Sequence, residues 1–241
     1  MTSPNSSLPW SNPSHIAGAI QSTIISNVLT RAVWEAHIAD CLKYRFQAAM
    51  IPPAWVRATA DALQGSGIHT ASFIDFPYGT MTSEGKAYEA GVLVDKGAEE
   101  IDLMPNVGFL LSGMEKEYAG DIRGVVAAAG AVPVKIMLEL PLLNPQQRER
   151  AVKLSVEAGA AYLKNASGGA VGVATPEDIR FLRRLAPARV RIKASGGIKT
   201  ARHVLEVLQA GAELVGTSAG VQIMKEVLGE SRPQTSAPSS Y

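Results

Sequence analysis

The 241-residue sequence predicts an α/β fold, and within that class a single (β/α)8 barrel with flexible N- and C-terminal tails. About eight apolar, strand-like segments alternate with helical patterns between residues 15 and 228. Helix ends recur as a Gly, then an Ala, then an apolar strand, at Gly97, Gly130, Gly159 and Gly211. Gly stops a helix because it takes the left-handed conformation at little cost. The intervals of 33, 29 and 52 residues, the last being two units of 26, indicate a βα repeat.

The expected strands lie near residues 17–21, 46–51, 69–76, 99–104, 132–139, 160–164, 189–193 and 213–217. Helices fill the gaps, and two of their starts are legible at Asn144-Pro145 and Thr175-Pro176. Each pairs an N-cap residue with a proline in the first turn. An open, doubly wound sheet is the alternative fold. No GxGxxG motif follows the first expected strand, which counts against a dinucleotide-binding sheet.

The chain is expected to divide into an arm at 1–14, a barrel at 15–228 and a tail at 229–241. Both end segments are rich in Ser and Pro, and the first lacks the basic start and apolar stretch of a secretory signal. The sequence contains no run of 18 apolar residues, so no membrane span is predicted. We therefore expect a cytoplasmic protein that does not bind membranes.

Composition narrows the class of function. The net charge is +1, and no aromatic residues interleave with a basic stripe, so nucleic-acid binding is not expected. The single cysteine, Cys41, is expected to pack within a helix. The four histidines are scattered and no metal site is predicted from them: His15, His37, His69 and His203.

Two lysines in similar local sequence are the strongest indication of chemistry. Lys164 precedes Asn165-Ala166-Ser167-Gly168, and Lys193 precedes Ala194-Ser195-Gly196-Gly197, each at the end of an expected strand. Lysines so placed are expected to direct their amines into a site at the carboxyl end of a barrel. Two amines close together cannot both hold a proton comfortably, so one becomes a nucleophile toward carbonyls. The residues alone leave open which amine attacks.

Other polar residues fall on neighbouring strands. Asp102 lies on the fourth, and strand alternation places Lys135, Met137 and Glu139 on one face of the fifth. A carboxylate and several amines in one lumen make a proton-transfer site. The same residues can instead form structural ion pairs that close the barrel, and the sequence pattern alone leaves both interpretations open.

Glycine-rich segments follow the last two expected strands. Ser195-Gly196-Gly197 and Gly216-Thr217-Ser218 are expected to bind phosphate through backbone N–H groups, as the corresponding loops of many such barrels do. The segment Gly216-Thr217-Ser218-Ala219-Gly220 also fits G-x-S-x-G. No histidine follows Ser218, so a serine hydrolase is not favoured.

From about residue 15 to 228 the sequence resembles the deoxyribose-phosphate aldolase family, class I aldolases on a TIM barrel. The motifs that carry the resemblance are Phe76-Pro77-Tyr78-Gly79, Glu100-Ile101-Asp102, Asn106-Val107-Gly108, Lys135 through Glu139, Glu157 through Ala160, Lys164, Lys193 through Ile198, and Gly216-Thr217-Ser218.

The resemblance implies a role for each matching residue. Lys164 corresponds to the lysine that forms the Schiff base, Lys193 to the second lysine that makes it reactive, and Asp102 to the acid that relays protons through water. Gly196, Gly197 and Ser218 fall on the phosphate loops. A terminal tyrosine on the tail of some members reaches the site, and Tyr241 is in that position here.

Departures from the family pattern concern the substrate shell. Gln21 stands where members commonly carry an Asp, and Asp75 stands where they carry a Gly. The residues after Lys164, among them Asn165, Ser167 and Gly168, form a segment whose sequence differs from that of the family. We count Asp75, Asn165, Ser167 and Gly168 among the substrate-binding residues. Gly169 stands where some members carry a phosphate-binding lysine.

The leading hypothesis is a cofactor-free lyase that splits 2-deoxyribose 5-phosphate into acetaldehyde and glyceraldehyde 3-phosphate, since the iminium supplies the electron sink. A related lysine-dependent aldolase with a changed, non-phosphorylated or secondary-metabolite acceptor is the second. A non-catalytic barrel that binds a sugar phosphate or a partner protein is the third. A homodimer or tetramer is compatible with each.

Overall fold

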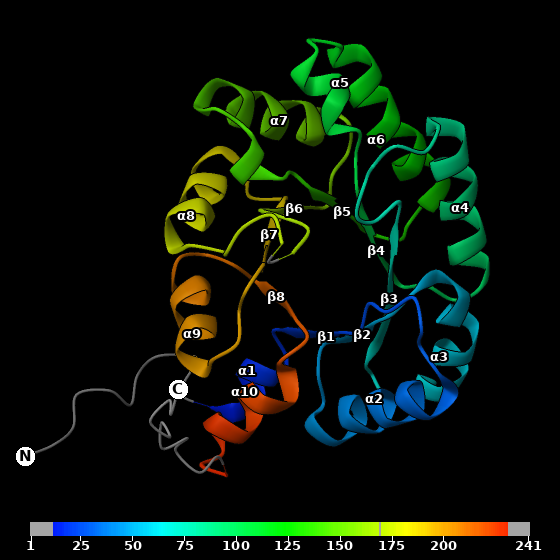
Figure 1. Ribbon diagram of the computed structural model, residues 1–241, viewed down its shortest axis with the longest axis vertical. Coiled ribbons are helices and arrows are strands. Elements are labelled where there is room, and N and C mark those ends of the chain that lie inside the picture. Colours follow the sequence, from blue (N-terminus) through cyan, green and yellow to red (C-terminus); the bar gives the residue numbers. More distant parts are fainter. Residues whose placement is uncertain (1–11, 169, 231–241) are drawn as a thin grey trace, which may run out of the picture.

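The computed structural model describes residues 12–168 and 170–230. Within them, eight parallel strands close in sequence order into a barrel surrounded by helices (Figure 1). This confirms the predicted (β/α)8 barrel. The strands are β1 (Ile20–Thr23), β2 (Ala48–Met50), β3 (His69–Ile74), β4 (Glu100–Leu103), β5 (Val134–Met137), β6 (Tyr162–Lys164), β7 (Arg191–Ser195) and β8 (Leu214–Thr217).

Helices connect each strand to the next and form the outer layer of the barrel. The α-helices are α1 (Pro13–Ala17), α2 (Arg31–Tyr44), α3 (Val56–Leu63), α4 (Ser83–Asp95), α5 (Val107–Leu111), α6 (Glu115–Ala129), α7 (Pro145–Glu157), α8 (Pro176–Leu185), α9 (Ala201–Gln209) and α10 (Gly220–Val227). Two 3-10 helices, η2 (Pro53–Trp55) and η3 (Leu140–Leu142), follow β2 and β5.

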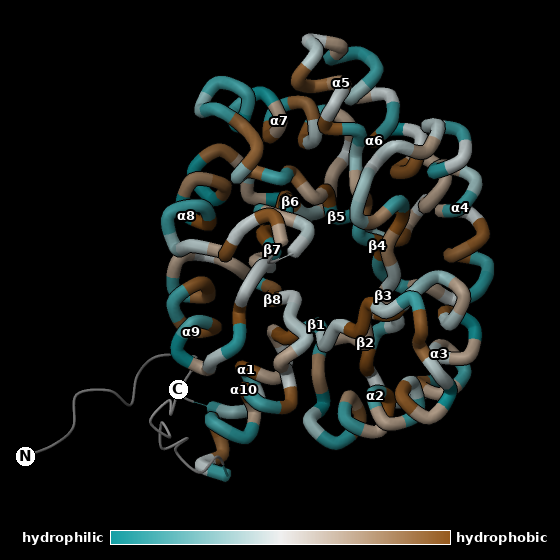
Figure 2. Tube along the Cα trace, viewed as in Figure 1, coloured by the Kyte–Doolittle hydropathy of each residue, from teal (hydrophilic) through white to brown (hydrophobic). Residues whose placement is uncertain are grey.

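The apolar core lies between the barrel wall and the helices. In α9, Val204 and Leu208 are buried, and Leu205 packs against the same core. Figure 2 shows the hydrophobic residues of the outer helices turned mainly toward the strands and the hydrophilic ones toward solvent. Cys41 is fully buried in α2, which confirms its predicted packing role.

Two helix starts agree with the sequence signals. The side chain of Asn144 accepts a hydrogen bond from Gln147 N, and the side-chain oxygen of Gln147 accepts one from Asn144 N, which completes a capping box. Thr175 accepts from Asp178 N at the start of α8. Each cap satisfies N–H groups that lack a partner in the first turn.

The first strand begins later than predicted. Residues 13–17 form α1, and β1 starts at Ile20, so the expected strand at 17–21 is wrong at its beginning. Asn12 caps α1 by accepting a hydrogen bond from Ser14 N, and Pro13 occupies the first turn. Helix α1 packs against α10. The rest of the expected arm, 1–11, and the tail from 231 lie outside the described residues.

Strands β3 and β5 each end two residues before the predicted boundary, and a left-handed residue lies within two positions after each of them. Asp75 has φ +56° directly after β3, and Glu139 has φ +52° before η3. L-residues rarely adopt this region, and it turns the chain out of the strand. Conversely, β7 extends further than expected, to Ser195, whereas β8 ends at Thr217 as expected, so Ser195 and Gly216 belong to strands and not to the loops that follow them.

Candidate active site

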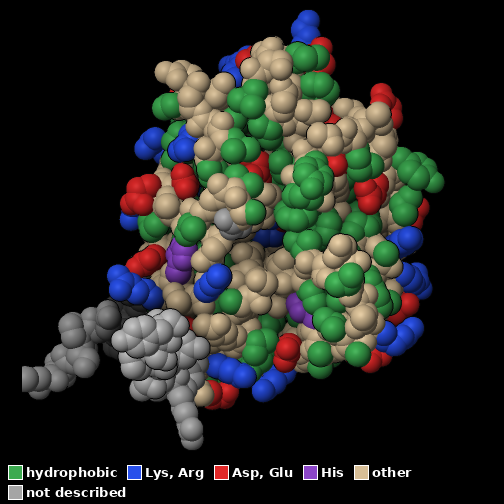
Figure 3. All heavy atoms as spheres, viewed as in Figure 1, with side chains coloured by type: hydrophobic (Ala, Val, Ile, Leu, Met, Phe, Trp, Pro, Cys, Tyr) green, Lys and Arg blue, Asp and Glu red, His purple; other side chains and the backbone are tan. Residues whose placement is uncertain are grey.

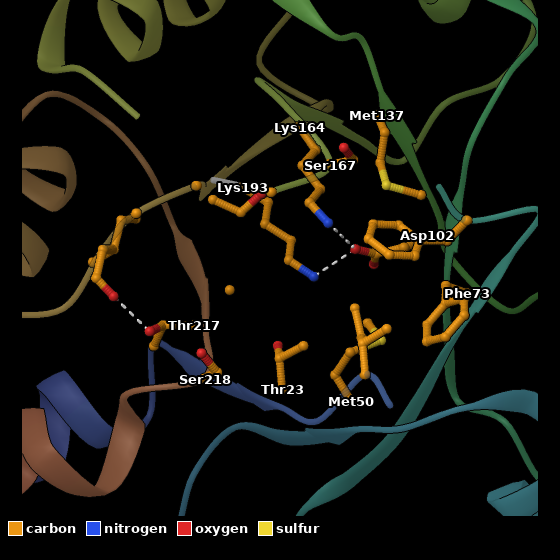
Figure 4. Close-up of a pocket in the computed structure, with 18 of the residues that line it drawn as sticks. Thr23, Met50, Phe73, Asp102, Met137, Lys164, Ser167, Lys193, Thr217 and Ser218 are labelled. Atoms are coloured by element: carbon orange, nitrogen blue, oxygen red, sulfur yellow. Dashed lines mark hydrogen bonds and ion pairs between the residues drawn. The ribbon is translucent and has the colours of Figure 1, made fainter. Parts of the chain in front are cut away.

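The two lysines predicted to act together lie side by side on neighbouring strands. Lys164 ends β6 and pairs in register with Lys193 in β7. Register neighbours in a parallel sheet present their side chains on the same face. Both side chains enter the barrel lumen at the carboxyl end of the strands, as Figure 4 shows.

One carboxylate oxygen joins the two amines. Lys164 Nζ lies 2.9 Å from Asp102 Oδ2, and Lys193 Nζ lies 2.7 Å from the same oxygen. Asp102 extends toward the two lysines from the opposite side of the lumen (Figure 4). Asp102 is 1% exposed, Lys193 1% and Lys164 6%. Of the two lysine side chains, that of Lys164 is the more exposed to the pocket.

The electrostatic environment gives Asp102 and Lys193 different protonation behaviour. Burial alone raises the pKa of Asp102, but the charges of Lys164, Lys193 and Lys135 outweigh it and hold this pKa far below its usual range. Burial lowers the pKa of Lys193 to about 7, helped by the positive charges of Lys164 and Lys135 and opposed by Asp102. Asp102 is thus a carboxylate at neutral pH, while Lys193 sheds its proton readily.

A second polar layer lies beneath this pair. Lys135 Nζ is 2.7 Å from Glu100 Oε2 and 3.2 Å from Asp102 Oδ1. Gln47 Nε2 and His69 Nδ1 reach Glu100 Oε1 at 2.5 and 2.6 Å. Burial raises the pKa of Glu100, but Lys135 and these hydrogen bonds bring it to about 2.

The sequence reasoning missed Glu100 as a member of this layer. Its signal was available, because Glu100 and Asp102 are two residues apart on one strand and so share a face. The predicted lumen face of the fifth strand is confirmed for Lys135 and Met137. Glu139 lies beyond β5, and its carboxylate accepts a hydrogen bond of 2.5 Å from Ser167 N.

Above the lysines is a cavity of about 590 Å³. Figure 3 shows it as a hollow near the centre of this face, with basic side chains at its bottom. Its polar lining includes Ser167, Gly168, Gly196, Gly197 and Ser218, all of them predicted to bind substrate. The opposite wall is apolar and is formed by Met50, Phe73, Phe76 and Met137.

Comparison with known proteins decides the family. The chain is 37% identical to a deoxyribose-phosphate aldolase from Bacillus subtilis over 211 residues, 83% of this chain and 95% of that protein. It is 39% identical to the one from Bacillus cytotoxicus over 188 residues, 78% of this chain and 84% of that protein. The chain belongs to the deoxyribose-phosphate aldolase family. It is an aldolase and thus a lyase, as the resemblance predicts.

Solved structures agree. A tetrameric deoxyribose phosphate aldolase from Aeropyrum pernix superposes with a TM-score of 0.83 at 28% identity, covering 91% of this chain and 94% of that one. No family model matches the chain.

Two predicted substrate residues of the aldolase do not line the cavity. Asp75 Oδ2 accepts a hydrogen bond from Met81 N at 2.7 Å and lies 3.3 Å from Lys86 Nζ. The buried Lys86 in turn lies 2.7 Å from Asp121. Asp75 therefore fastens the β3–α4 loop and does not face the pocket.

Asn165 also has a structural partner. Its side chain donates to Ser195 O at 3.0 Å and accepts from Ser195 N at 2.8 Å, which ties β6 to β7 beyond the lysines. The amide is 1% exposed. The backbone of Gly196 lies close to that of Gly172, because a Cβ on Gly196 would lie 2.3 Å from Gly172 O. Tyr241 and Gly169 fall outside the described residues.

Among residues 12–168 and 170–230, no group of three or more His, Cys, Asp or Glu side chains is arranged to hold a metal ion. Nor does any helix in that part of the aldolase have the length and apolar character needed to cross a membrane.

Proposed function

We propose that this aldolase reversibly cleaves 2-deoxy-D-ribose 5-phosphate into acetaldehyde and D-glyceraldehyde 3-phosphate, through a Schiff base on Lys164. The observation that carries the proposal is the pair of amines on one buried carboxylate oxygen at the bottom of the cavity. Such a pair supplies a neutral amine, a proton donor and a fixed negative charge within hydrogen-bonding distance of one another.

Lys164 is the proposed nucleophile because its side chain is the more exposed of the two. Lys193 serves as the proton exchanger, since its pKa of about 7 lets it both hold and release a proton near neutral pH. Asp102 lies between the amines and passes a proton from one to the other. Its fixed negative charge also stabilises the iminium cation as that cation forms.

The steps follow from this arrangement. The neutral Lys164 amine attacks the aldehyde carbon of the open sugar, and the carbinolamine loses its hydroxyl as water to leave an iminium. The C3 hydroxyl then gives up its proton to the neutral amine of Lys193, the C2–C3 bond breaks, and the electrons of that bond flow into the iminium. Glyceraldehyde 3-phosphate leaves, while acetaldehyde remains as an enamine on Lys164. Protonation of the enamine carbon and addition of water release acetaldehyde and restore the amine.

The phosphate end of the substrate is assigned to the loops after β7 and β8. Gly196 and Gly197 have φ of +112° and +63°, so their loop turns tightly and brings backbone groups to the cavity. Ser218 and the exposed side chain of Lys199 line the same end. Tyr241 is assigned to protonation of the enamine carbon.

A trapping experiment tests the Schiff base. The protein is incubated with acetaldehyde, reduced with borohydride and digested, and the adduct is located by mass spectrometry. We expect the adduct on Lys164, with a yield that rises as the pH passes upward through about 7, because the amine pair must lose a proton before attack. No adduct on any lysine at neutral pH would overturn the proposal.

A second candidate is a related aldolase with a different acceptor. The apolar wall favours it, since Phe73 and Phe76 lie with ring centroids 5.3 Å apart beside Met50 and Met137. Such a wall suits a less hydroxylated or non-phosphorylated aldehyde. Lys199 is then a surface lysine with no role in binding.

Cleavage rates separate the two candidates. If the acceptor is phosphorylated, 2-deoxyribose 5-phosphate is cleaved with a kcat/KM about 100-fold above that of free 2-deoxyribose, as expected when a phosphate gains charged hydrogen bonds. In that case Lys199→Met reduces the preference. Equal rates on both sugars, unchanged in Lys199→Met, favour the changed acceptor.

Three coarser features belong to the same proposal. Residues 15–228 are proposed as the catalytic unit. A homo-oligomer is supported by the tetrameric relative from Aeropyrum pernix. With the proposed substrate, the enzyme acts in the cytoplasm, in the breakdown of deoxyribonucleotides.

A further inference from the structure

Gln21 lies on β1 beneath the cavity and is fully buried. Its Oε1 accepts a hydrogen bond of 2.5 Å from Lys193 Nζ. Its Nε2 donates at 2.7 Å to Glu100 Oε2 and at 2.7 Å to Gln47 Oε1. Gln21 thus links the reactive lysine pair to the lower polar layer.

The orientation of this amide is dictated by its partners. A carboxylate only accepts hydrogen bonds and an ammonium only donates them. The amide NH2 must therefore face Glu100, and the amide oxygen must face Lys193. Since both ends are engaged, the side chain cannot flip without losing contacts at Glu100 and Lys193 together.

The fold leaves space for this contact across an intervening strand. Lys193 is on β7 and Gln21 on β1, with β8 between them, and Gly216 of β8 pairs in register with Gln21. A Cβ at Gly216 would lie 3.0 Å from Lys193 Cε and 3.6 Å from its Nζ. The absence of a side chain at Gly216 lets the lysine cross β8 and reach the amide.

The two amines are consequently held to different degrees. Lys193 Nζ is fixed between Asp102 Oδ2 and Gln21 Oε1. Within the described part of the chain, the hydrogen bond of Lys164 Nζ goes to Asp102 alone. Lys164 can therefore leave the carboxylate to attack a carbonyl, whereas Lys193 would have to break two hydrogen bonds.

The groups facing Lys193 show why a neutral partner suits this position. The charged ones are Asp102 on β4, Lys135 on β5 and Lys164 on β6. Gln21 provides the contact from β1 and adds no charge of its own. It holds the amine in place without a second carboxylate that would favour the protonated form.

We propose that Gln21 is a positioning residue, whose amide oxygen holds the Lys193 amine at the floor of the cavity and thereby leaves Lys164 as the amine that forms the Schiff base. This rests on the proposed function. Gln21 does not line the cavity, so it acts through Lys193 and not on the substrate.

The test is Gln21→Met, which keeps the length of the side chain and removes the acceptor. Borohydride trapping with acetaldehyde is expected to label Lys164 alone in the unaltered protein, and Lys193 as well as Lys164 in Gln21→Met. We expect kcat for aldol cleavage to fall about tenfold, as for the loss of one hydrogen bond to a charged group, and KM to change less than about twofold.

Two further variants serve as controls. Gln47→Met removes the other amide bound to Glu100 and one of the two hydrogen bonds donated by Gln21 Nε2, but it leaves Gln21 Oε1 on Lys193, so its adduct should stay on Lys164. Gln21→Glu keeps an oxygen for Lys193 whether or not the new carboxyl is protonated, and it too should label Lys164 alone. Circular dichroism confirms that each variant is folded.

The outcomes separate this inference from the proposed function. Labelling of Lys164 alone in Gln21→Met, with kcat unchanged, would overturn the role of Gln21 while leaving the Schiff base intact. Labelling of Lys193 in Gln47→Met would assign the effect to the whole polar layer and overturn it equally. An unaltered protein that forms no adduct would remove the proposed function itself.

Discussion

Lys164→Met is expected to lower kcat/KM for aldol cleavage by about 10⁴-fold or more, the range seen when an enzyme loses its nucleophile. Methionine matches the length of the lysine stem and fills the same space, so the barrel is expected to fold. The variant keeps Lys193 and Asp102, but Lys193 stays fastened to Asp102 and Gln21 and does not replace the lost amine. Steady-state cleavage, together with the trapping assay, measures the loss.

The matched control for Lys164→Met is Lys199→Met, which removes a lysine from the rim of the same cavity. Its amine is not part of the Asp102 pair, so acetaldehyde should still be trapped on Lys164. If Lys164→Met retained more than about a tenth of the activity, another residue would have to be the nucleophile.

The fold was predictable because its signals are local. The Gly-Ala boundaries mark helix ends by their own backbone chemistry, as at Gly159 and Gly211, which have φ of +101° and +111°. The placement of Lys164 and Lys193 on neighbouring strands needed only the strand order of a barrel, although Lys193 lies within β7 and not at its end. The expected first strand begins too early because Asn12-Pro13 starts a helix, α1, in the same way as Asn144-Pro145 starts α7.

The site was less predictable because its contacts cross strands. Asp75 is polar and ends a strand, which is typical of a substrate residue, yet its left-handed backbone turns it toward the buried Lys86. In the sequence alone, Gln21 is recognisable only as a departure from the family pattern. Its contact with Lys193 depends on the absence of a side chain at Gly216 in β8. Because the contact involves three strands, the residue pattern along any one of them does not reveal it.

Asp102→Asn is expected to have the second largest effect, on both stability and activity. Asp102 is a buried carboxylate within 3.2 Å of three buried amines, those of Lys135, Lys164 and Lys193. Removing one partner of a buried ion pair costs about 3 to 5 kcal/mol, because the remaining charge is left without compensation. For a chain of this length that corresponds to a fall in Tm on the order of 10 °C.

Activity falls with the same change. Asparagine keeps the shape of Asp102 but cannot take a proton from one amine and return it to the other. It also carries no negative charge to stabilise the iminium on Lys164. We expect a loss in kcat of about 10² to 10⁴, the range for a general acid–base group. A surface carboxyl, Glu117, provides the control, since Glu117→Gln should change stability by less than about 0.5 kcal/mol.

The pH dependence of stability distinguishes a charge effect from a packing effect. Lys193 has a pKa of about 7 in the folded protein and about 10.5 when unfolded, so between these values the unfolded state binds more protons and stability rises with pH. Without Asp102 the folded pKa of Lys193 drops further, and the rise begins at lower pH. Because the variant then gains stability below pH 7, where the unaltered protein does not yet, the deficit of Asp102→Asn in urea unfolding should be largest in mildly acidic solution, at about pH 5, and should shrink as the pH rises to about 7. A deficit independent of pH would instead mean that Asp102 stabilises the barrel by shape and hydrogen bonding and not by its charge.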